Sequence, residues 1–327
     1  MKDFDYVLAK SVEDAARHGS AQHARFIAGG TLLVDLLRLN VERPELVVDL
    51  NQALSSEIRV EENLLRIGAL ARNSELAHHE RVKLDYPALS EALLSGASPQ
   101  IRNMASVGGN LLQRTRCAYF RDSAVRECNK RSPGAGCAAL AGFTRMHAIL
   151  GGSDRCIAAH PSDMCVALLA LDATVLTQGP QGTRSIPIAE LHTLPGDQPQ
   201  IESVLVPGEI VTYIEVPRRP YSKRSAYVKA RDRASFAFAL ASAAVALELD
   251  GGTIRAVRVA LGGVATKPWR AAETEAALLG GPASEEAFQS AAKLAANGAR
   301  TRPDNDFKRT LTERVVLSAL RRAWKRA

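Results

Sequence analysis

The sequence lacks three patterns that would place it in a common class: a long apolar run, a basic leader and evenly spread cysteines. No apolar run approaches the roughly 20 residues that a bilayer-spanning helix needs. The chain begins Met1-Lys2-Asp3-Phe4-Asp5, which is polar where a signal peptide would be basic and then apolar. Its Cys count of 5 is low for 327 residues, and all of them lie between Cys117 and Cys165. We therefore expect a soluble chain with no export signal of its own, and not a domain stapled by disulfides.

Motifs of hydrolytic and nucleotide-cleaving enzymes are also missing. The sequence contains no H-E-x-x-H, G-x-S-x-G or P-loop pattern. Its G-x-G-x-x-A match, Gly134 to Ala139, follows Pro133 rather than a hydrophobic strand, which argues against a Rossmann fold. The adjacent His78 and His79 lie at a polar helix end, where we expect them to be solvated. Nothing in the sequence therefore nominates a nucleophile.

The charge of the chain is a weaker clue than its cysteines. There are 42 Lys+Arg against 35 Asp+Glu, a formal net charge of +7, and 46% of the residues are hydrophobic. The length suggests about two domains with real cores. Because the charge excess is modest and no nucleic-acid-binding motif accompanies it, that class of function is not favoured. Basic residues concentrate around the cysteines, from Arg114 to Arg131, and again from Arg321 to Arg326, where they suit a helix C-terminus.

Hydrophobic patterning predicts mixed helix and strand in the first part of the chain. A buried strand at 25–28 stops at Gly29-Gly30, a helix follows at 31–38, and a second strand follows at 46–50. A second glycine pair, Gly108-Gly109, begins a long stretch without periodicity. Loops of such length are uncommon unless they are functional or disordered. Something must therefore hold this stretch in place.

The rest of the chain predicts a second unit. Pro161-Ser162-Asp163 is a plausible cap for an apolar helix, a strand at 210–216 ends at Pro217, and the run at 236–249 fits helix or strand. Asp250-Gly251-Gly252 then favours a β-hairpin. Helices are expected at about 271–279, 284–297 and 306–325. The expected fold class is α+β, with one domain at residues 1–217, an insertion in it at about 111–160, and a domain of a sheet with helices on one side at residues 222–327.

The two glycine pairs are candidates for a phosphate site. Glycine between a strand and a helix permits positive φ and lets backbone N–H groups approach a phosphate closely. Two such turns in one domain would clamp a pyrophosphate from both sides. The alternative is that each pair, Gly29-Gly30 and Gly108-Gly109, is an ordinary tight turn.

One of the five cysteines is expected in the apolar core, and the other four are candidate metal ligands. Cys165 follows Met164 on an apolar helix, so we interpret it as a core thiol. Four remain: Cys117, Cys128, Cys137 and Cys156. Four thiolates suit a zinc ion or a 4Fe-4S cluster, although the C-x2–4-C knuckle usual for structural zinc is missing. Unligated thiols or two disulfides are the other possibilities, and spacing alone does not choose between them.

Four motifs in order resemble one family. The matching segments are Phe26-Ile27-Ala28-Gly29-Gly30-Thr31-Leu32-Leu33, Gln100-Ile101-Arg102-Asn103 with Ala105-Ser106-Val107-Gly108-Gly109-Asn110-Leu111, Pro161-Ser162-Asp163, and Tyr227-Val228-Lys229. Over essentially its whole length, the chain resembles the FAD-binding subunit of the xanthine dehydrogenase family of molybdenum hydroxylases. The resemblance implies a two-part PCMH-type FAD-binding domain, followed by a C-terminal domain like that of CO dehydrogenase flavoproteins. It implies no catalytic residue on this chain.

The resemblance also implies which residues contact FAD. The two glycine turns would surround the pyrophosphate and ribityl chain, while Asp163, Val211 and Lys229 match other cofactor contacts of the family. The full set is Phe26, Ile27, Ala28, Gly29, Gly30, Thr31, Leu32, Leu33, Ala105, Ser106, Gly108, Gly109, Asn110, Asp163, Val211 and Lys229.

The insertion resembles a subset of these flavin subunits that carries an extra 4Fe-4S cluster. This subset occurs in 4-hydroxybenzoyl-CoA reductase and in bacterial periplasmic aldehyde oxidoreductase, and the stretches around Cys117, Cys128 and Cys137 are most similar to the latter. The resemblance therefore implies a 4Fe-4S cluster with Cys117, Cys128, Cys137 and Cys156 as ligands.

The function implied by the resemblance is electron transfer in a heteromeric oxidoreductase that acts on aldehydes. A large molybdenum-cofactor subunit would oxidise the substrate, a small 2Fe-2S subunit would relay electrons, and this chain would pass them through FAD to an external acceptor. A free-standing FAD oxidoreductase of the same fold and a zinc-stapled interaction module are the alternatives. We expect a periplasmic location through co-export with a partner subunit, or else a cytoplasmic one. The substrate and the acceptor are not encoded in any pattern of this chain.

Overall fold

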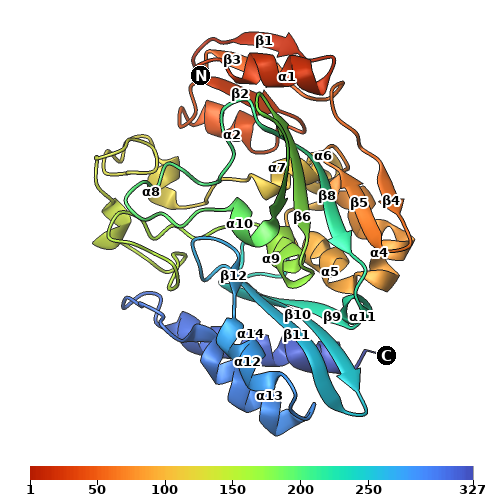
Figure 1. Cartoon of the computed structure of the whole chain (residues 1–327). Coiled ribbons are helices and arrows are strands. Elements are labelled where there is room, and N and C mark those ends of the chain that lie inside the picture. Colours follow the sequence, from red (N-terminus) through yellow and green to blue (C-terminus); the bar gives the residue numbers. More distant parts are fainter. Residues whose placement is uncertain (327) are drawn as a thin grey trace.

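The computed structural model describes residues 1–326, which form three sheets stacked along the molecule, from the N-terminal end at the top of Figure 1 to the C-terminal end at the bottom. The first sheet is parallel, in the order β1-β3-β2. Its elements are β1 (Asp5–Leu8), α1 (Val12–Gly19), β2 (Ala24–Ile27), α2 (Leu33–Arg38) and β3 (Leu46–Asp49). The predicted strand, glycine pair, helix and strand are therefore confirmed, with helix α2 beginning two residues later than expected.

The second sheet has five strands in the order β4-β5-β8-β6-β7. Its strands are β4 (Ile58–Val60), β5 (Leu64–Gly68), β6 (Thr174–Gly179), β7 (Gly182–Pro187) and β8 (Ile210–Pro217). The helices of this part are α3 (Asn73–His78), α4 (Glu80–Asp85), α5 (Pro87–Ser95), α6 (Pro99–Met104), α7 (Val107–Leu111), α9 (Asp163–Ala170) and α10 (Ile188–Leu191). Strand β8 lies at the centre, where Ile214 and Val216 are fully buried. Ser162 caps the wholly buried helix α9, as predicted, by accepting a hydrogen bond from the Cys165 N–H.

The third sheet is antiparallel, in the order β12-β11-β10-β9, with helices packed on its lower face in Figure 1. Its elements are α11 (Pro220–Lys223), β9 (Ser225–Ala230), β10 (Ala241–Asp250), β11 (Thr253–Gly262), β12 (Trp269–Arg270), α12 (Ala272–Leu278), α13 (Glu285–Ala292) and α14 (Phe307–Trp324). The run at 236–249, for which the sequence allowed helix or strand, contains most of strand β10. It carries no alternating pattern because α9 contacts it as well as α14, so that both faces are buried. Gly251 and Gly252 turn the predicted hairpin with φ of 53° and 89°.

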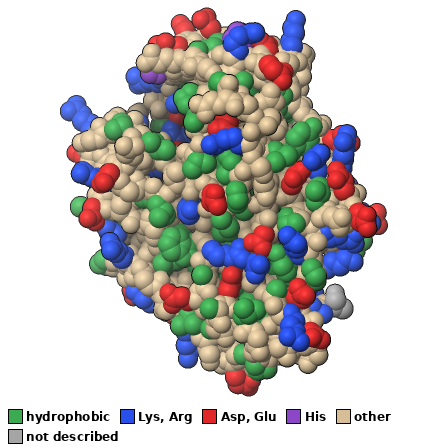
Figure 2. Space-filling view, in the orientation of Figure 1, with side chains coloured by type: hydrophobic (Ala, Val, Ile, Leu, Met, Phe, Trp, Pro, Cys, Tyr) green, Lys and Arg blue, Asp and Glu red, His purple; other side chains and the backbone are tan. Residues whose placement is uncertain are grey.

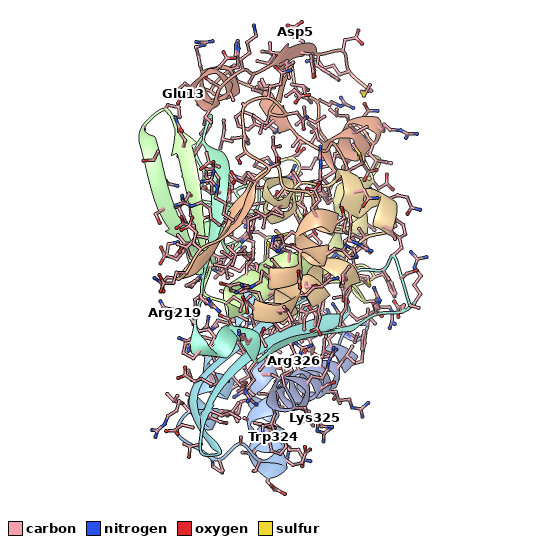
Figure 3. All side chains as sticks on the ribbon, turned by 90° about the vertical axis from the view of Figure 1, so that its right-hand side faces the viewer. Asp5, Glu13, Arg219, Trp324, Lys325 and Arg326 are labelled. Carbon is pink, nitrogen blue, oxygen red and sulfur yellow. The ribbon has the colours of Figure 1, made fainter. Side chains whose placement is uncertain are left out.

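The C-terminal basic run lies at the end of α14, as expected for a helix C-terminus. Arg321 pairs with Glu285, and Arg322 lies 2.9 Å from the Glu91 carboxylate of helix α5. Figure 3 shows Trp324, Lys325 and Arg326 close together at this end of the molecule. Over the face drawn in Figure 2, basic and acidic side chains are interspersed, which agrees with the modest net charge.

The insertion runs from the end of α7 to the start of α9 and is ordered with little regular structure. It contains α8 (Ala118–Arg121), a 3-10 turn at Ala138–Leu140 and a β-bridge between Cys128 and Cys137, and its Leu150 forms a further bridge with Ala265. In Figure 1 it is the yellow-green part around α8, on the left of the molecule.

Ion pairs fasten the insertion to the rest of the fold. Arg114 pairs with Glu42 and with Glu202, and Lys130 Nζ lies 2.9 Å from the Glu202 carboxylate. Burial alone would raise the pKa of Glu202, but Arg114 and Lys130 hold it below its usual value. Across residues 1–326, no helix has both the length and the apolarity that crossing a bilayer requires.

Candidate cofactor cavities

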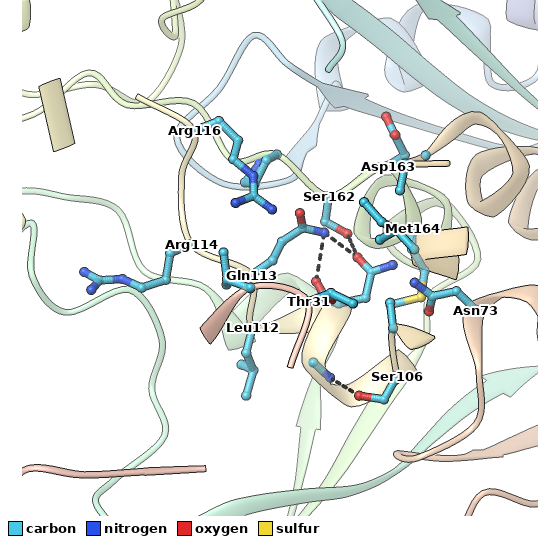
Figure 4. Close-up of a pocket in the computed structure, with 18 of the residues that line it drawn as sticks. Thr31, Asn73, Ser106, Leu112, Gln113, Arg114, Arg116, Ser162, Asp163 and Met164 are labelled. Carbon is cyan, nitrogen blue, oxygen red and sulfur yellow. Dashed lines mark hydrogen bonds between the residues drawn. The ribbon is translucent and has the colours of Figure 1, made fainter. Parts of the chain in front are cut away.

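A cavity of about 1220 Å³, called here the large cavity, opens between the first sheet, the second sheet, the insertion and the loop after β9. Figure 4 shows part of its wall. Every residue that the resemblance predicted to contact FAD lines it: Phe26, Ile27, Ala28, Gly29, Gly30, Thr31, Leu32, Leu33, Ala105, Ser106, Gly108, Gly109, Asn110, Asp163, Val211 and Lys229. Segments distant in the sequence therefore converge on one space large enough for a dinucleotide.

The two glycine turns are packed against each other. A side chain at Gly29 would collide with the carbonyl of Met104, the last residue of α6, which directly precedes the second turn. Gly30 has φ of 68°, in the left-handed region that favours glycine. In the second turn, the Gly109 N–H donates to Ser106 Oγ over 3.2 Å, and Gly109 itself is exposed. The backbone of both turns therefore faces the cavity without side chains in the way.

Polar side chains tie the second turn to helix α9. Ser162 Oγ donates to Asn110 Oδ1 over 2.8 Å, and the Gln113 side-chain amide donates to the same oxygen (Figure 4). Asn110 and the cap of α9 are thereby fixed relative to each other. This arrangement positions Asp163, the first residue of α9, at the cavity wall.

Asp163 forms a buried triad with two residues of β9. Lys229 Nζ lies 2.7 Å from Asp163 Oδ2 and also donates to the carbonyl of Ser95. Tyr227 OH donates to the other oxygen of Asp163. Burial, with the Asp163 charge, raises the pKa of Tyr227 well above its usual value. Asp163 and Lys229 are predicted cofactor contacts, whereas Tyr227 belongs to the same motif without a predicted role, although alternate residues of a strand share one face.

Two arginines of the insertion also line the large cavity and were missed. Arg121 Nη2 lies 2.6 Å from Asp35 Oδ2, and Arg116 Nη1 lies 3.8 Å from the same oxygen. Burial and the neighbouring Arg121 lower the pKa of Arg116 to about 10. The excess of arginine around the cysteines is visible in the sequence, but no local pattern indicates which of these arginines face a cavity.

The four remaining cysteines meet at a second, small cavity, called here the cysteine cavity. Cys117, Cys128, Cys137 and Cys156 all line it. Cys128 and Cys156 are buried, the other two are half-buried, and all are free thiols, so the structure contains no disulfide among its described residues. Burial raises the pKa of Cys117 to about 12 and also raises that of Cys156. Thiols so buried ionise readily only when a cation such as a metal centre is bound.

The spacing of these cysteines argues against a single zinc ion. A tetrahedral site with Zn–S bonds of about 2.3 Å places its sulfurs about 3.8 Å apart. Among residues 1–326, the one group of three or more candidate ligand atoms within 4.8 Å of one another is His160, Cys165 and His192. No three of the four sulfurs therefore lie within 4.8 Å of one another, which is wider than the spacing in a preformed tetrahedral zinc site. A cluster of several irons separates its ligands further, so the donor set suits such a cluster better.

Cys165 is the core thiol that the sequence predicted, with no exposed surface. Its neighbours are not only apolar, however, because the rings of His160 and His192 lie beside it with centroids 4.5 Å apart. His192 Nε2 donates to the carbonyl of Leu111. Nothing local in the sequence indicated this histidine pair.

The two cavities share part of their walls. Cys117 lines both of them, and His147 lines the large cavity while its Nε2 lies 3.2 Å from Cys117 Sγ. The Cys117 side chain alone would therefore separate a group held by the four cysteines from a ligand in the large cavity.

Comparisons with known proteins agree with this architecture. Residues 2–219 match the family described as the FAD binding domain in molybdopterin dehydrogenase, and residues 225–327 match the CO dehydrogenase flavoprotein C-terminal domain. The chain is 48% identical to the aldehyde oxidoreductase FAD-binding subunit PaoB of Escherichia coli strain K12, covering 99% of each chain. It is 31% identical to the 6-hydroxypseudooxynicotine dehydrogenase complex subunit alpha of Paenarthrobacter nicotinovorans, covering 98% of this chain and 95% of that one.

Among solved structures, the chain is similar to one in carbon monoxide dehydrogenase from Hydrogenophaga pseudoflava. The TM-score is 0.76 at 26% identity, over 98% of this chain and 97% of the other. The expected fold class is therefore confirmed.

Proposed function

Because the chain belongs to the family of FAD-binding subunits of molybdenum hydroxylases, we propose that it is the electron-transfer flavoprotein of a heteromeric aldehyde oxidoreductase and that it carries a 4Fe-4S cluster beside its FAD. Its relatives are subunits of dehydrogenases and oxidoreductases, and the chain is an oxidoreductase subunit like them. The proposal extends this family membership to the cluster, the direction of electron flow and the aldehyde substrate.

The main support for the proposal is that the four cysteines meet at one cavity, which adjoins the large cavity. Thiolates are the ligands that iron–sulfur clusters use. The spacing of the sulfurs disfavours zinc, and Lys130 lies near Cys156, where positive charge favours a thiolate. The residues present therefore fit a cluster, and they fit FAD through the two open glycine turns.

The chain's own residues bind and orient, while bound FAD would supply the electron-carrying chemistry. The backbone N–H groups of the first glycine turn suit phosphate oxygens, whereas those of Val107 to Asn110 in the second turn already donate within the protein. Asp163 and Lys229 line the large cavity elsewhere as a buried ion pair, and Tyr227 supports Asp163 through its hydrogen bond. No motif of this chain provides a nucleophile or a base for substrate chemistry, which suits a subunit whose substrate binds elsewhere.

We propose a small 2Fe-2S subunit and a large molybdenum-cofactor subunit as partners, and a separate molecule as the electron acceptor. One relative is named as a subunit of a dehydrogenase complex, and others are named as medium chains, which supports assembly with further subunits. The aldehyde as substrate of the whole complex rests on the name of the relative that is 48% identical. Periplasmic location by co-export stays a prediction, which cell fractionation with and without a signal-bearing partner subunit tests.

Metal and flavin analysis of the anaerobically purified chain tests the proposal. About one FAD with about four irons per chain supports it. FAD without iron would instead favour a free-standing flavoenzyme of the same fold. Zinc without flavin would favour an interaction module whose cysteines bind zinc and whose glycine pairs are ordinary turns.

A further inference from the structure

Arg116 and Arg121 are two guanidinium groups that share one carboxylate. Both reach Asp35, at 3.8 Å and 2.6 Å, and both line the large cavity. Arg116 Nε and Arg121 Nη1 are buried and have no hydrogen-bond partner within the described residues. Since arginine stays charged in proteins, this corner of the cavity holds more positive than negative charge.

The other basic side chains that line the large cavity have their own partners. Arg25 and Arg114 pair with Glu42, and Lys229 pairs with Asp163. Arg102 and Arg233 donate only to backbone carbonyls, such as those of Gly96 and Phe236, and Arg102 Nε is also buried without a partner among the described residues. Positive charge is therefore in excess at several places on this wall, and the Arg116–Arg121 pair is the place where two neighbouring guanidinium groups share Asp35.

The pair lies beside both glycine turns. Asp35, which it contacts, is in the first turn of α2, two residues after the segment Gly29 to Leu33 ends. Arg116 itself follows the second turn by only a few residues and packs over the ring of Phe238, 5.1 Å from its centroid. Figure 4 shows the Arg116 side chain extending into the pocket on the same side as Gln113, the residue that hydrogen-bonds to Asn110 of the second turn.

We propose that Arg116 and Arg121 bind the pyrophosphate of the dinucleotide, so that the cysteine-bearing insertion completes the FAD site. A pyrophosphate carries two negative charges and several acceptor oxygens, which match the charge excess and the free N–H groups of the pair. Guanidinium groups bind phosphate oxygens through paired, charge-assisted hydrogen bonds. The first glycine turn would contribute backbone N–H groups, while the second, whose N–H groups from Val107 to Asn110 already donate within the protein, would allow a close approach of the ligand at Gly109. This inference rests on the proposed function, because it takes FAD as the occupant of the large cavity.

A rival explanation places the balancing charge in the cysteine cavity. Arg116 directly precedes Cys117, and a cluster held by four thiolates carries negative charge. In that case the pair would affect iron binding or the cluster potential and leave FAD affinity unchanged. The two explanations therefore differ in what a substitution alters.

The experiment measures binding of FAD and of riboflavin, which lacks phosphate, to the full chain after removal of its flavin. The variants are Arg116→Gln, Arg121→Gln and the double variant, with Arg126→Gln as the matched control, an exposed arginine of the same insertion. We expect each single change to weaken FAD binding about tenfold or more, because a hydrogen bond to a charged group is lost. Riboflavin binding should change less than about twofold, and the control should bind both flavins like the wild type.

Equal weakening of FAD and riboflavin, or unchanged FAD affinity, would overturn the inference, and altered iron content with unchanged FAD affinity would assign the pair to the cluster. Arg121→Lys keeps the charge and should restore part of the FAD affinity, which separates a binding role from a folding defect. A wild-type chain that binds no FAD contradicts the proposed function itself. If the wild type prefers FAD to riboflavin and the variants keep the same preference, only the inference is contradicted.

Discussion

Cys117 Sγ lies 3.2 Å from Nε2 of His147, and both residues also face the large cavity. The contact joins the two candidate cofactor sites through one thiol and one imidazole. Lys308 Nζ donates to the carbonyl of His147 and so links this junction to helix α14 of the C-terminal part. The junction therefore connects the insertion with the large cavity and with the last helix.

Replacing His147 should change the reduction potential of a cluster in the cysteine cavity. A hydrogen bond to a ligand sulfur stabilises the more negative, reduced cluster, so that His147→Leu lowers the potential while iron and FAD content stay full. A redox titration followed by electron paramagnetic resonance measures the shift. His78→Leu, at an exposed histidine, serves as the control. An unchanged potential in His147→Leu with full iron would mean that the contact does not act on the cluster.

Removing one cysteine ligand should lower the iron content of the chain without lowering its FAD content. Cys128→Ser takes away one buried thiol of the cysteine cavity, so we expect iron content to fall while FAD stays bound. Cys165→Ala is the matched control, because Cys165 is buried in the core and lies outside that cavity. Iron and flavin analysis of both purified variants measures the effect. Full iron in Cys128→Ser would exclude this residue from the ligand set.

A side chain at the second glycine turn should obstruct the ligand. Gly109 is exposed toward the large cavity, and an added Cβ would closely approach only Ser106 Oγ. Gly109→Val should therefore weaken FAD binding about tenfold or more, because its side chain occupies space of the ligand, and the melting temperature measures how far the displaced Ser106, which caps α7, also lowers stability. Gly281→Val, in the C-terminal part, is the control and should bind FAD like the wild type. Undiminished affinity in Gly109→Val contradicts the phosphate clamp.

The features that the sequence predicted are those carried by neighbouring residues. The turn at Gly29-Gly30, the cap at Ser162 and the hairpin at Gly251-Gly252 each depend on a few consecutive positions. Strand β7 was missed because its residues are exposed and polar except Ile186, which leaves no alternating pattern. Strand β10 was ambiguous because burial on both faces removes the same pattern.

The candidate sites also contain some features that the sequence predicted and others that it did not. The glycine motifs and the cysteine cluster were visible in the sequence, and the structure brings each set to one cavity. The Arg116 contact with Asp35 and the packing of His160 against His192 were not predictable, because their partners are distant in sequence. Such contacts depend on how the insertion folds back over the first two sheets, and no local pattern encodes that.

The buried amine of Lys308 predicts a pH dependence of stability. Burial, together with the charge of Arg145, lowers the pKa of Lys308 from 10.5 to about 7. Below pH 7 the amine is protonated in the folded and the unfolded chain, so the cost of burying its charge is fully present. Between about pH 7 and pH 10.5 only the unfolded chain keeps this proton, so the free energy of unfolding rises with pH.

Lys308→Met removes this titration. The free energy of unfolding of the wild type should rise relative to that of the variant by at most about 1.4 kcal/mol per pH unit above pH 7. Denaturant unfolding at several pH values measures the difference, and Lys325→Met, at an exposed lysine, should run parallel to the wild type. A constant difference between wild type and Lys308→Met would show that the amine does not change its protonation in this range.

The most direct test of FAD and a 4Fe-4S cluster in one chain is a crystal structure of the anaerobically purified protein, with diffraction data collected on both sides of the iron absorption edge. We predict an anomalous iron signal bounded by Cys117, Cys128, Cys137 and Cys156, and flavin density in the large cavity beside the two glycine turns. A signal at the zinc edge in its place, or thiols without metal next to bound flavin, would contradict the account.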